Sequence, residues 1–566
     1  MKRNFLFFAF LFSVSMLSLT SVNAATSLSD GQGIAYYRAG FPLVAKPLLI
    51  NEIATDSTTR AETSFNLGNI YFSENLVDSA RLCFVKGVAA NPLNSLNAIG
   101  LTMLKIKSDP AAAELEFTNI LKLKQNKKNV DVYIAIANAY LFNDVIDKAL
   151  IYQDKAKSIK PKYAPVYVVL GDIELAKKNV GEACRNYEQA IYFDDKCKEA
   201  FIKYARAYKN VNTPLAIEKL NALKVKEPSF LLVDKELADI YYSINNFGKA
   251  AELYNNYLQS GNSNVQDLTQ YAFTLFLGGQ FEKSLEVTKL GLVKASRNPV
   301  FNRLAMYNNV DLTAQYKIDK KESESQNANA AALTAADNFF NNTDNPKFTY
   351  LDYRYFGQAL RDKKQIELAI PQFEKALQLD STKTDLWKDI SDMYSDINDY
   401  LKSIPAYNKY LKPISDDKRS PDMLMTLAKR YYGLGNDVKV IDASIKKDAL
   451  QKADSIFGLV AQKEPTGYRG NYWRARTNSS LDPETSLGLA KPYYEQTATL
   501  VESKADVKFN PVLIECYSYL GYYYLVQKDN TQSLNYWNKI LVIDATNTTA
   551  KKAIEGITKA IKGVKK

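Results

Sequence analysis

The side chains that most often perform acid–base and metal chemistry are scarce in this sequence. It contains no histidine, which is the commonest general acid–base residue and metal ligand in proteins. Gly248-Lys249 lacks the preceding glycine of a phosphate-binding loop, and no G-x-S-x-G motif occurs. The acidic pairs 194–195 and 416–417 would suit a carboxylate-only mechanism, but they lie in predicted turns, where helix capping explains them. The sequence therefore predicts a protein that is not an enzyme and binds no cofactor or metal.

The four cysteines are the remaining reactive groups: Cys83, Cys184, Cys197 and Cys516. An even number of cysteines in an exported chain can indicate disulfides. Cys184 and Cys197 are predicted near opposite ends of one helix, however, and nine helical residues already span roughly 13 Å. That separation exceeds the ~7 Å limit between the Cα atoms of a bridged pair. We therefore expect buried, unpaired thiols.

The first 24 residues resemble a secretory signal peptide. Lys2 and Arg3 precede an uncharged, mostly apolar run over residues 5–19, and Ala24 ends a stretch of small or short side chains. A transmembrane anchor is the alternative, but the run is shorter than the ~20 residues that a span needs. We expect cleavage after Ala24 and a periplasmic protein that is not a lipoprotein and has no membrane span. Losing two basic residues lowers the formal charge from +11 to +9.

The rest of the chain carries a motif that recurs with a period near 34 residues. In one copy, Gly68 is followed by Ala80 twelve residues later and by Phe84 sixteen residues later. The same spacing recurs in three further copies: Gly171, Ala183 and Tyr187; Gly357, Ala369 and Phe373; and Gly521, Ser533 and Trp537. Apolar residues three or four apart indicate buried helical stripes, and prolines such as Pro92 end the second helix. Each copy is predicted to be a helical hairpin whose helices meet closely at the small residues.

This spacing of small, aromatic and proline residues resembles the tetratricopeptide repeat (TPR), and the chain resembles exported multi-repeat TPR proteins of Gram-negative bacteria. The resemblance implies an all-α fold, a right-handed α–α superhelix (solenoid) of about 12–13 helix-turn-helix repeats with a C-terminal capping helix. We expect a signal peptide at 1–24, a degenerate N-terminal repeat or cap at 25–60, a TPR array at 61–316, an insertion or hinge with a long second helix at 317–345, a second TPR array at 346–547 and a basic capping helix at 548–566.

In TPR proteins the first helix of each repeat lines a concave groove, and the resemblance therefore assigns the binding face to positions beside or one turn before the small residue. Carried over position by position, the groove residues are Asn69, Asn138, Asp172, Arg206, Asp239, Phe273, Arg354, Gln358, Lys429, Tyr432, Tyr472, Arg476 and Tyr522. A second row of groove positions includes Phe65, Ile134 and Val168. Phe65 stands where the chaperone-tail-binding TPR subfamily has a carboxylate-holding lysine, so a chaperone tail is not the expected partner.

Many repeats, an export signal and the lack of a catalytic set favour a scaffold for protein–protein interaction in the bacterial cell envelope. The alternative is a carbohydrate- or peptidoglycan-binding module, because Tyr472 and Trp473 are adjacent and aromatic rings can stack on sugars. Export and mixed charge argue against nucleic acid. We therefore expect envelope proteins as partners, with a glycan as the alternative ligand.

Overall fold

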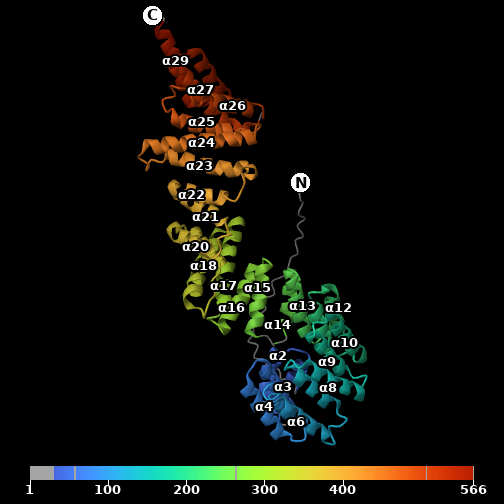
Figure 1. The fold of residues 1–566 in the computed structure, drawn as a ribbon. Helices are drawn as coiled ribbons and strands as arrows, with labels where there is room; N and C mark the ends of the chain where they lie inside the picture. Colours follow the sequence, from blue (N-terminus) through green and yellow to red (C-terminus); the bar gives the residue numbers. More distant parts are fainter. Residues whose placement is uncertain (1–30, 57–58, 260, 262–263, 505, 565–566) are drawn as a thin grey trace, which may run out of the picture. The chain divides into compact units, whose positions relative to one another are not determined.

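The computed structural model describes residues 31–56, 59–259, 261, 264–504 and 506–564 (Figure 1). These residues form 29 α-helices and two short 3-10 helices, and no strand occurs among them. The signal peptide predicted at 1–24 lies outside the described residues. Two compact units make up the chain, unit 1 (Met1–Ala295) and unit 2 (Ser296–Lys566), and each is described by itself.

Unit 1 is a succession of helical hairpins in which each helix packs on the next. Its helices are α1 (Gln32–Arg38), α2 (Pro42–Thr55), α3 (Arg60–Ser73), α4 (Val77–Ala90), α5 (Ser95–Met103), α6 (Pro110–Lys122), α7 (Val130–Leu141), α8 (Ile146–Ile159), α9 (Ala164–Ala176), α10 (Val180–Phe193), α11 (Lys198–Tyr208), α12 (Thr213–Lys226), α13 (Leu232–Ser243), α14 (Phe247–Leu258), α15 (Val265–Leu277) and α16 (Phe281–Lys294).

Unit 2 continues the same plan and ends in a single helix. Its helices are α17 (Pro299–Ile318), α18 (Glu322–Asn342), α19 (Tyr350–Asp362), α20 (Ile366–Leu379), α21 (Leu386–Asp396), α22 (Tyr400–Leu411), α23 (Pro421–Asn436), α24 (Ala443–Lys463), α25 (Arg469–Leu481), α26 (Lys491–Glu502), α27 (Asn510–Val526), α28 (Asn530–Ile543) and α29 (Thr548–Val564). The predicted all-α repeat architecture is confirmed, with thirteen hairpins from α3 to α28 and one more formed by α1 and α2.

In four hairpins the recurring spacing of sixteen residues places a glycine under an aromatic ring of the second helix. A Cβ atom added to Gly68 would lie 2.3 Å from the Phe84 ring, and one added to Gly171 would lie 2.3 Å from the Tyr187 ring. The corresponding distances are 2.6 Å for Gly357 and Phe373 and 2.8 Å for Gly521 and Trp537. Non-bonded carbon atoms are most stable about 3.5–4.0 Å apart, so only glycine fits at these positions without displacing the ring.

The spacing of twelve residues corresponds to a second contact between the two helices. Where the later residue is serine, its hydroxyl donates a hydrogen bond to the carbonyl oxygen of the earlier residue. These bonds run from Ser284 to Ala272 (2.8 Å), from Ser325 to Thr313 (3.0 Å), from Ser403 to Ser391 (2.7 Å) and from Ser533 to Gly521 (2.7 Å). Serine is small enough for the close approach, and the bond satisfies a hydroxyl that would otherwise be buried without an acceptor.

The predicted insertion at 317–345 contributes to two long helices. α17 has 20 residues and α18 has 21, and they are joined by a short turn at residues 319–321. Buried alanines on α18, including Ala332 and Ala336, allow it to pack closely against its neighbours. The extra residues therefore lengthen both arms of one hairpin, and the Thr313–Ser325 contact keeps the repeat's twelve-residue spacing within it.

Candidate functional site

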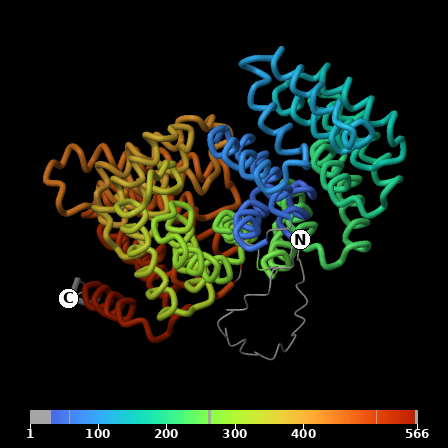
Figure 2. Tube along the Cα trace, turned by 90° about the horizontal axis from the view of Figure 1, so that it is seen from below, coloured from blue at the N-terminus to red at the C-terminus, as the bar shows by residue number. Residues whose placement is uncertain are grey.

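The corner between α1 and α2 (residues 39–44) contacts helices far along unit 1. Phe41 is 4% exposed, and its ring lies edge-on to Phe230 with the centroids 6.0 Å apart. Arg206 Nη1 donates to the Gly40 carbonyl oxygen (2.8 Å), and its guanidinium lies 5.0 Å from the centre of the Phe41 ring. Figure 2 shows the blue N-terminal helices beside green helices of the later repeats of this unit. The corner thus closes unit 1 against α11–α14.

A cavity of about 620 Å³ lies between this corner and the inner helices α3, α5, α7, α9 and α11. It is lined by four of the predicted groove residues, Asn69, Asn138, Asp172 and Arg206, and by Phe65, Ile134 and Val168 of the second predicted row. A smaller cavity of about 380 Å³ on the other side of the corner is lined by Arg206 and by Asp239, a fifth predicted residue. Both volumes fall in the range of ligand-binding pockets, roughly 300–1,000 Å³.

Lysine 203 holds two carboxylates together on one wall of the larger cavity. Lys203 Nζ lies 2.5 Å from Asp172 Oδ2 and 2.8 Å from Glu199 Oε1, and the Tyr187 hydroxyl donates to Asp172 Oδ1 (2.8 Å). Burial by itself would lower the pKa of Lys203, but the two carboxylates outweigh burial and raise this pKa. Burial raises the pKa of the Glu199 carboxyl above its usual range, because Lys203 compensates only part of the lost hydration.

Other polar groups of the two cavities are also tied into the protein. Burial raises the pKa of Tyr37 to about 12, partly offset by a hydrogen bond with Asn69. The Arg206 Nε lies 3.1 Å from each carboxylate oxygen of Glu236. The structure therefore brings Asn69 and Arg206 into the site that the sequence predicts, and adds Tyr37, Glu199 and Lys203, which sequence reasoning missed. The sequence signals for that corner are the adjacent Tyr36-Tyr37 pair and the prolines Pro42 and Pro47, which indicate a turn in a degenerate first repeat.

The remaining groove residue of unit 1 lies outside both cavities. Phe273, on α15, stacks on Phe276 with the ring centroids 6.2 Å apart, and it lines neither cavity. In unit 2, Arg354 and Tyr522 are exposed, and the Gln358 amide donates to Asp362 (3.2 Å).

Three predicted groove residues of unit 2 contact the Trp473 ring, and a fourth, Tyr472, is hydrogen-bonded to one of them. Lys429 Nζ lies 4.9 Å from the Trp473 ring centre, the Arg476 guanidinium lies 5.2 Å away and Tyr432 meets the ring edge-on at 5.2 Å. The indole also stacks on Phe457 (5.6 Å), and Arg476 Nη2 donates to the Tyr472 hydroxyl (2.6 Å). The aromatic pair that suggested sugar stacking is thus engaged by protein groups, which does not favour the glycan alternative.

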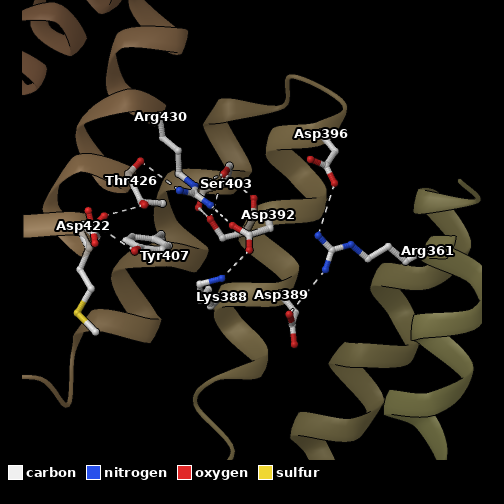
Figure 3. A network of polar contacts seen from close by, with 12 residues as sticks. Arg361, Lys388, Asp389, Asp392, Asp396, Ser403, Tyr407, Asp422, Thr426 and Arg430 are labelled. Carbon is white, nitrogen blue, oxygen red and sulfur yellow. Dashed lines mark hydrogen bonds and ion pairs between the residues drawn. The ribbon is translucent and has the colours of Figure 1, made fainter. Parts of the chain in front are cut away.

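Arginine 430, which sequence reasoning missed, centres a polar network on the inner helices of unit 2 (Figure 3). It is 4% exposed, pairs with Asp392 through Nη2 and donates through Nε to the Ser403 hydroxyl (2.9 Å). Lys388 pairs with the same Asp392 (2.9 Å), and the guanidinium of Arg361 lies 3.7 Å from Asp389 and from Asp396. These charges compensate one another within the unit.

Redox and metal groups do not form a second site in the described part of the chain. All four cysteines are unpaired; Cys83, Cys184 and Cys516 are buried and Cys197 is partly exposed. No group of three or more Cys, Asp or Glu side chains is arranged to hold a metal among the residues described. Within the same residues, no helix combines the length and apolar character needed to cross a membrane.

One sequence profile and several solved structures are similar to this chain. A sequence profile described as tetratricopeptide repeat matches residues 356–383, which include Gly357 and Phe373. No curated protein sequence matches the chain. Similar solved structures include the C-terminal part of a TPR repeat-containing protein from Cytophaga hutchinsonii, which is 26% identical, covers 50% of this chain and 99% of its own and has a TM-score of 0.40.

Two other similar structures have lower identity. A tetratricopeptide repeat protein from Parabacteroides merdae is 16% identical over 47% of this chain and 98% of its own, with a TM-score of 0.30. PilW, a type IV pilus biogenesis factor, is 19% identical over 37% of this chain and 97% of its own, with a TM-score of 0.30. The profile match at 356–383 and the glycine–aromatic contact inside it show that this chain contains a tetratricopeptide repeat, and the same contact recurs in other hairpins of the chain.

Proposed function

We propose that this TPR scaffold is exported to the bacterial cell envelope and holds a segment of a partner protein against the inner face of unit 1, without catalysing a reaction. The observation that carries the proposal is the cavity of about 620 Å³ lined by the first helices of five successive hairpins. A surface built from several repeats suits an extended segment, because each hairpin adds one increment of the concave face.

The lining combines an apolar part with fixed polar groups, as binding pockets generally do. Phe65, Leu96, Ile134 and Phe142 supply partly or largely exposed apolar surface, while Asp172 and Lys203 supply charge on a neighbouring wall. A partner segment would gain from covering the apolar surface, at about 25 cal/mol per Å², and would be oriented by the polar wall.

Site-specific photocrosslinking in the native cell envelope tests the binding face. A benzophenone amino acid at Phe142, which lines the cavity and is 41% exposed, is expected to form a covalent adduct with a partner protein. The matched control is Ile151 on α8 of the same hairpin, which is 47% exposed but lines neither of the two cavities of unit 1. An adduct of equal yield at both positions, or none at Phe142, would contradict binding at this face.

The proposed location rests on the signal-like segment at residues 1–24. Chemical sequencing of the protein isolated from a periplasmic extract should give an N-terminus at Ala25. Recovery of the uncleaved chain in the cytoplasmic fraction would rule out export, while leaving the binding face to be judged by the crosslinking result.

A further inference from the structure

The larger cavity of unit 1 contains more acidic than basic groups on its polar walls. Asp172 and Glu199 share the single cation Lys203, so this trio carries one net negative charge. Its side chains are only 21–30% exposed, and screening by water is therefore weaker than at an open surface.

Two further acidic residues, Glu62 and Asp131, line the same cavity. Glu62 pairs with Arg38, whereas Asp131 accepts only the Tyr163 hydroxyl (3.1 Å) and has no ion pair within the described part of the chain. Arg206 does not offset this charge, because its guanidinium is bound to Glu236. The cavity thus has two uncompensated negative charges.

Partly exposed apolar side chains line the same cavity, among them Phe65, Leu96 and Ile134. A ligand that covers them gains from removing apolar surface from water, at about 25 cal/mol per Å². The site therefore suits a ligand that carries both positive charge and apolar surface.

We propose that this cavity binds an extended polypeptide segment that contains both cationic and apolar side chains. A lysine or arginine of the segment lies between the acidic groups Glu199 and Asp131, and an apolar side chain packs on Phe65 and Ile134. This inference rests on the proposed function and narrows its partner class. An acidic segment would meet like charges, and a small cation would leave the apolar surface uncovered.

Peptide binding to the full mature chain tests the preference. Fluorescein-labelled nine-residue peptides would be compared by anisotropy in four sets: lysine with leucine, glutamate with leucine, serine with leucine, and lysine with serine. The lysine–leucine set should bind at least tenfold more tightly than each of the others, and its affinity should fall as salt increases. Equal affinity for the first three sets would overturn the proposal.

Single substitutions then locate the site. Glu199→Gln and Asp131→Asn should each weaken the lysine–leucine set severalfold and reduce its advantage over the serine–leucine set. Asp147→Asn is the matched control, since Asp147 occupies the first turn of α8 as Asp131 does in α7 and lines neither of the two cavities of unit 1. A preference that survives both charge substitutions would overturn the assignment to this cavity.

The two proposals can fail separately. A crosslink at Phe142 together with no charge preference would remove the cationic segment and leave the scaffold role intact. Absence of both the crosslink and any peptide affinity would remove both proposals. Thermal melting of each variant, with a midpoint equal to that of the natural chain, establishes that a lost affinity does not result from unfolding.

Discussion

At the scale of single residues, the repeat depends on glycine Cα hydrogens that contact aromatic rings. Gly171 faces Tyr187, which is fully buried and whose hydroxyl is held by Asp172. The ring cannot move away without breaking that hydrogen bond. This position differs from ordinary helical glycines, where a methyl group stabilises the helix.

We predict that Gly171→Ala lowers the free energy of unfolding of unit 1 by about 1–3 kcal/mol, because the added methyl group overpacks the hairpin. Gly181→Ala in the partner helix α10 is the matched control, since nothing lies within 4 Å of its Cβ position. It should be neutral or stabilise the helix by up to about 1 kcal/mol. Urea unfolding measures both variants, and equal shifts would argue against the close contact.

The Arg476–Glu515 pair shows that a residue predicted for the groove can serve stability instead. Arg476 Nε and Nη2 lie 2.7 and 2.5 Å from the two oxygens of Glu515, and the Tyr472 hydroxyl donates to the same carboxylate (2.6 Å). Burial would raise the pKa of Glu515, but the hydrogen bonds from Arg476 and Tyr472 outweigh it and lower the pKa below its ordinary value. The pair therefore stabilises unit 2 above the ordinary carboxyl pKa, and this stabilisation is lost as the pH falls through the lowered value.

We predict that Arg476→Ala destabilises unit 2 by about 1–2 kcal/mol at pH 7, allowing for the pair's partial exposure to solvent. The difference from the natural chain should shrink as the pH falls below the ordinary carboxyl pKa and through the lowered pKa of Glu515. Arg354→Ala, at an exposed arginine without an ion pair in the described structure, should change stability little at either pH. Urea titrations at pH 7 and pH 3.5 decide the matter; a pH-independent loss would show that the ion pair is not its cause.

At the scale of elements, the α1–α2 corner gives unit 1 a contact that a simple solenoid lacks. Solenoid repeats generally contact only their neighbours, whereas Phe41 packs on Phe230 of a hairpin much later in the chain. The corner also separates the two cavities of unit 1, so its packing determines the shape of the candidate site.

We predict that Phe41→Ala lowers the free energy of unfolding of unit 1 by about 3–5 kcal/mol, as is usual for a buried phenylalanine. Hydrogen exchange should accelerate in α2 and also in α13, across the corner. Leu43→Ala, at a residue of the same corner that is 59% exposed, should change stability by less than about 0.5 kcal/mol. Exchange that accelerates in α2 alone would mean that the corner does not hold the later helices.

At the scale of the whole molecule, the two units are expected to differ in how far the unfolding of one hairpin affects the other hairpins. Unit 1 is closed by its corner, while the hairpins of unit 2 contact mainly their neighbours along the chain. Stability in an open array is approximately a sum of repeat and nearest-neighbour contributions. A local defect should therefore weaken different lengths of chain in the two units.

We predict that Gly357→Ala, which places a Cβ 2.6 Å from the Phe373 ring, accelerates hydrogen exchange in α17–α22 and leaves α27 and α28 unchanged. Mass spectrometry of peptides from the two regions gives the measurement. A uniform acceleration throughout unit 2 would show that the array unfolds as one cooperative block.

The features that were predictable from the sequence are those that repeat locally. The spacing from Gly68 to Phe84 is the same in several hairpins, so periodicity revealed both the helices and their contact. The Thr313–Ser325 pair was overlooked because threonine and serine replace the usual glycine and alanine, which left the extra residues of that hairpin unassigned. The repeat register predicted which positions of each first helix face inward. Two of these residues, Asn69 and Asp172, line the same cavity in the structure.

Features that depend on distant pairs could not be predicted in the same way. No periodicity connects Phe41 with Phe230, or Arg476 with Glu515, and side-chain charge alone does not say which groups neutralise one another. Lys429 was chosen for the groove although the adjacent Arg430 is the buried arginine of the network. Neighbouring positions on a helix differ by about 100° around its axis. The sequence pattern did not show which of the two side chains, Lys429 or Arg430, is buried.

The contact between Phe41 and Phe230 also affects the order in which the parts of unit 1 can fold. Phe230 follows Phe41 by 189 residues, which a ribosome takes roughly 10–40 s to synthesise at about 5–20 residues per second. During that interval the corner can fold locally, but its aromatic side chain has no partner to cover it. Unit 1 therefore cannot be completed hairpin by hairpin from the N-terminus; its first hairpin reaches its final surroundings only after α13 has emerged.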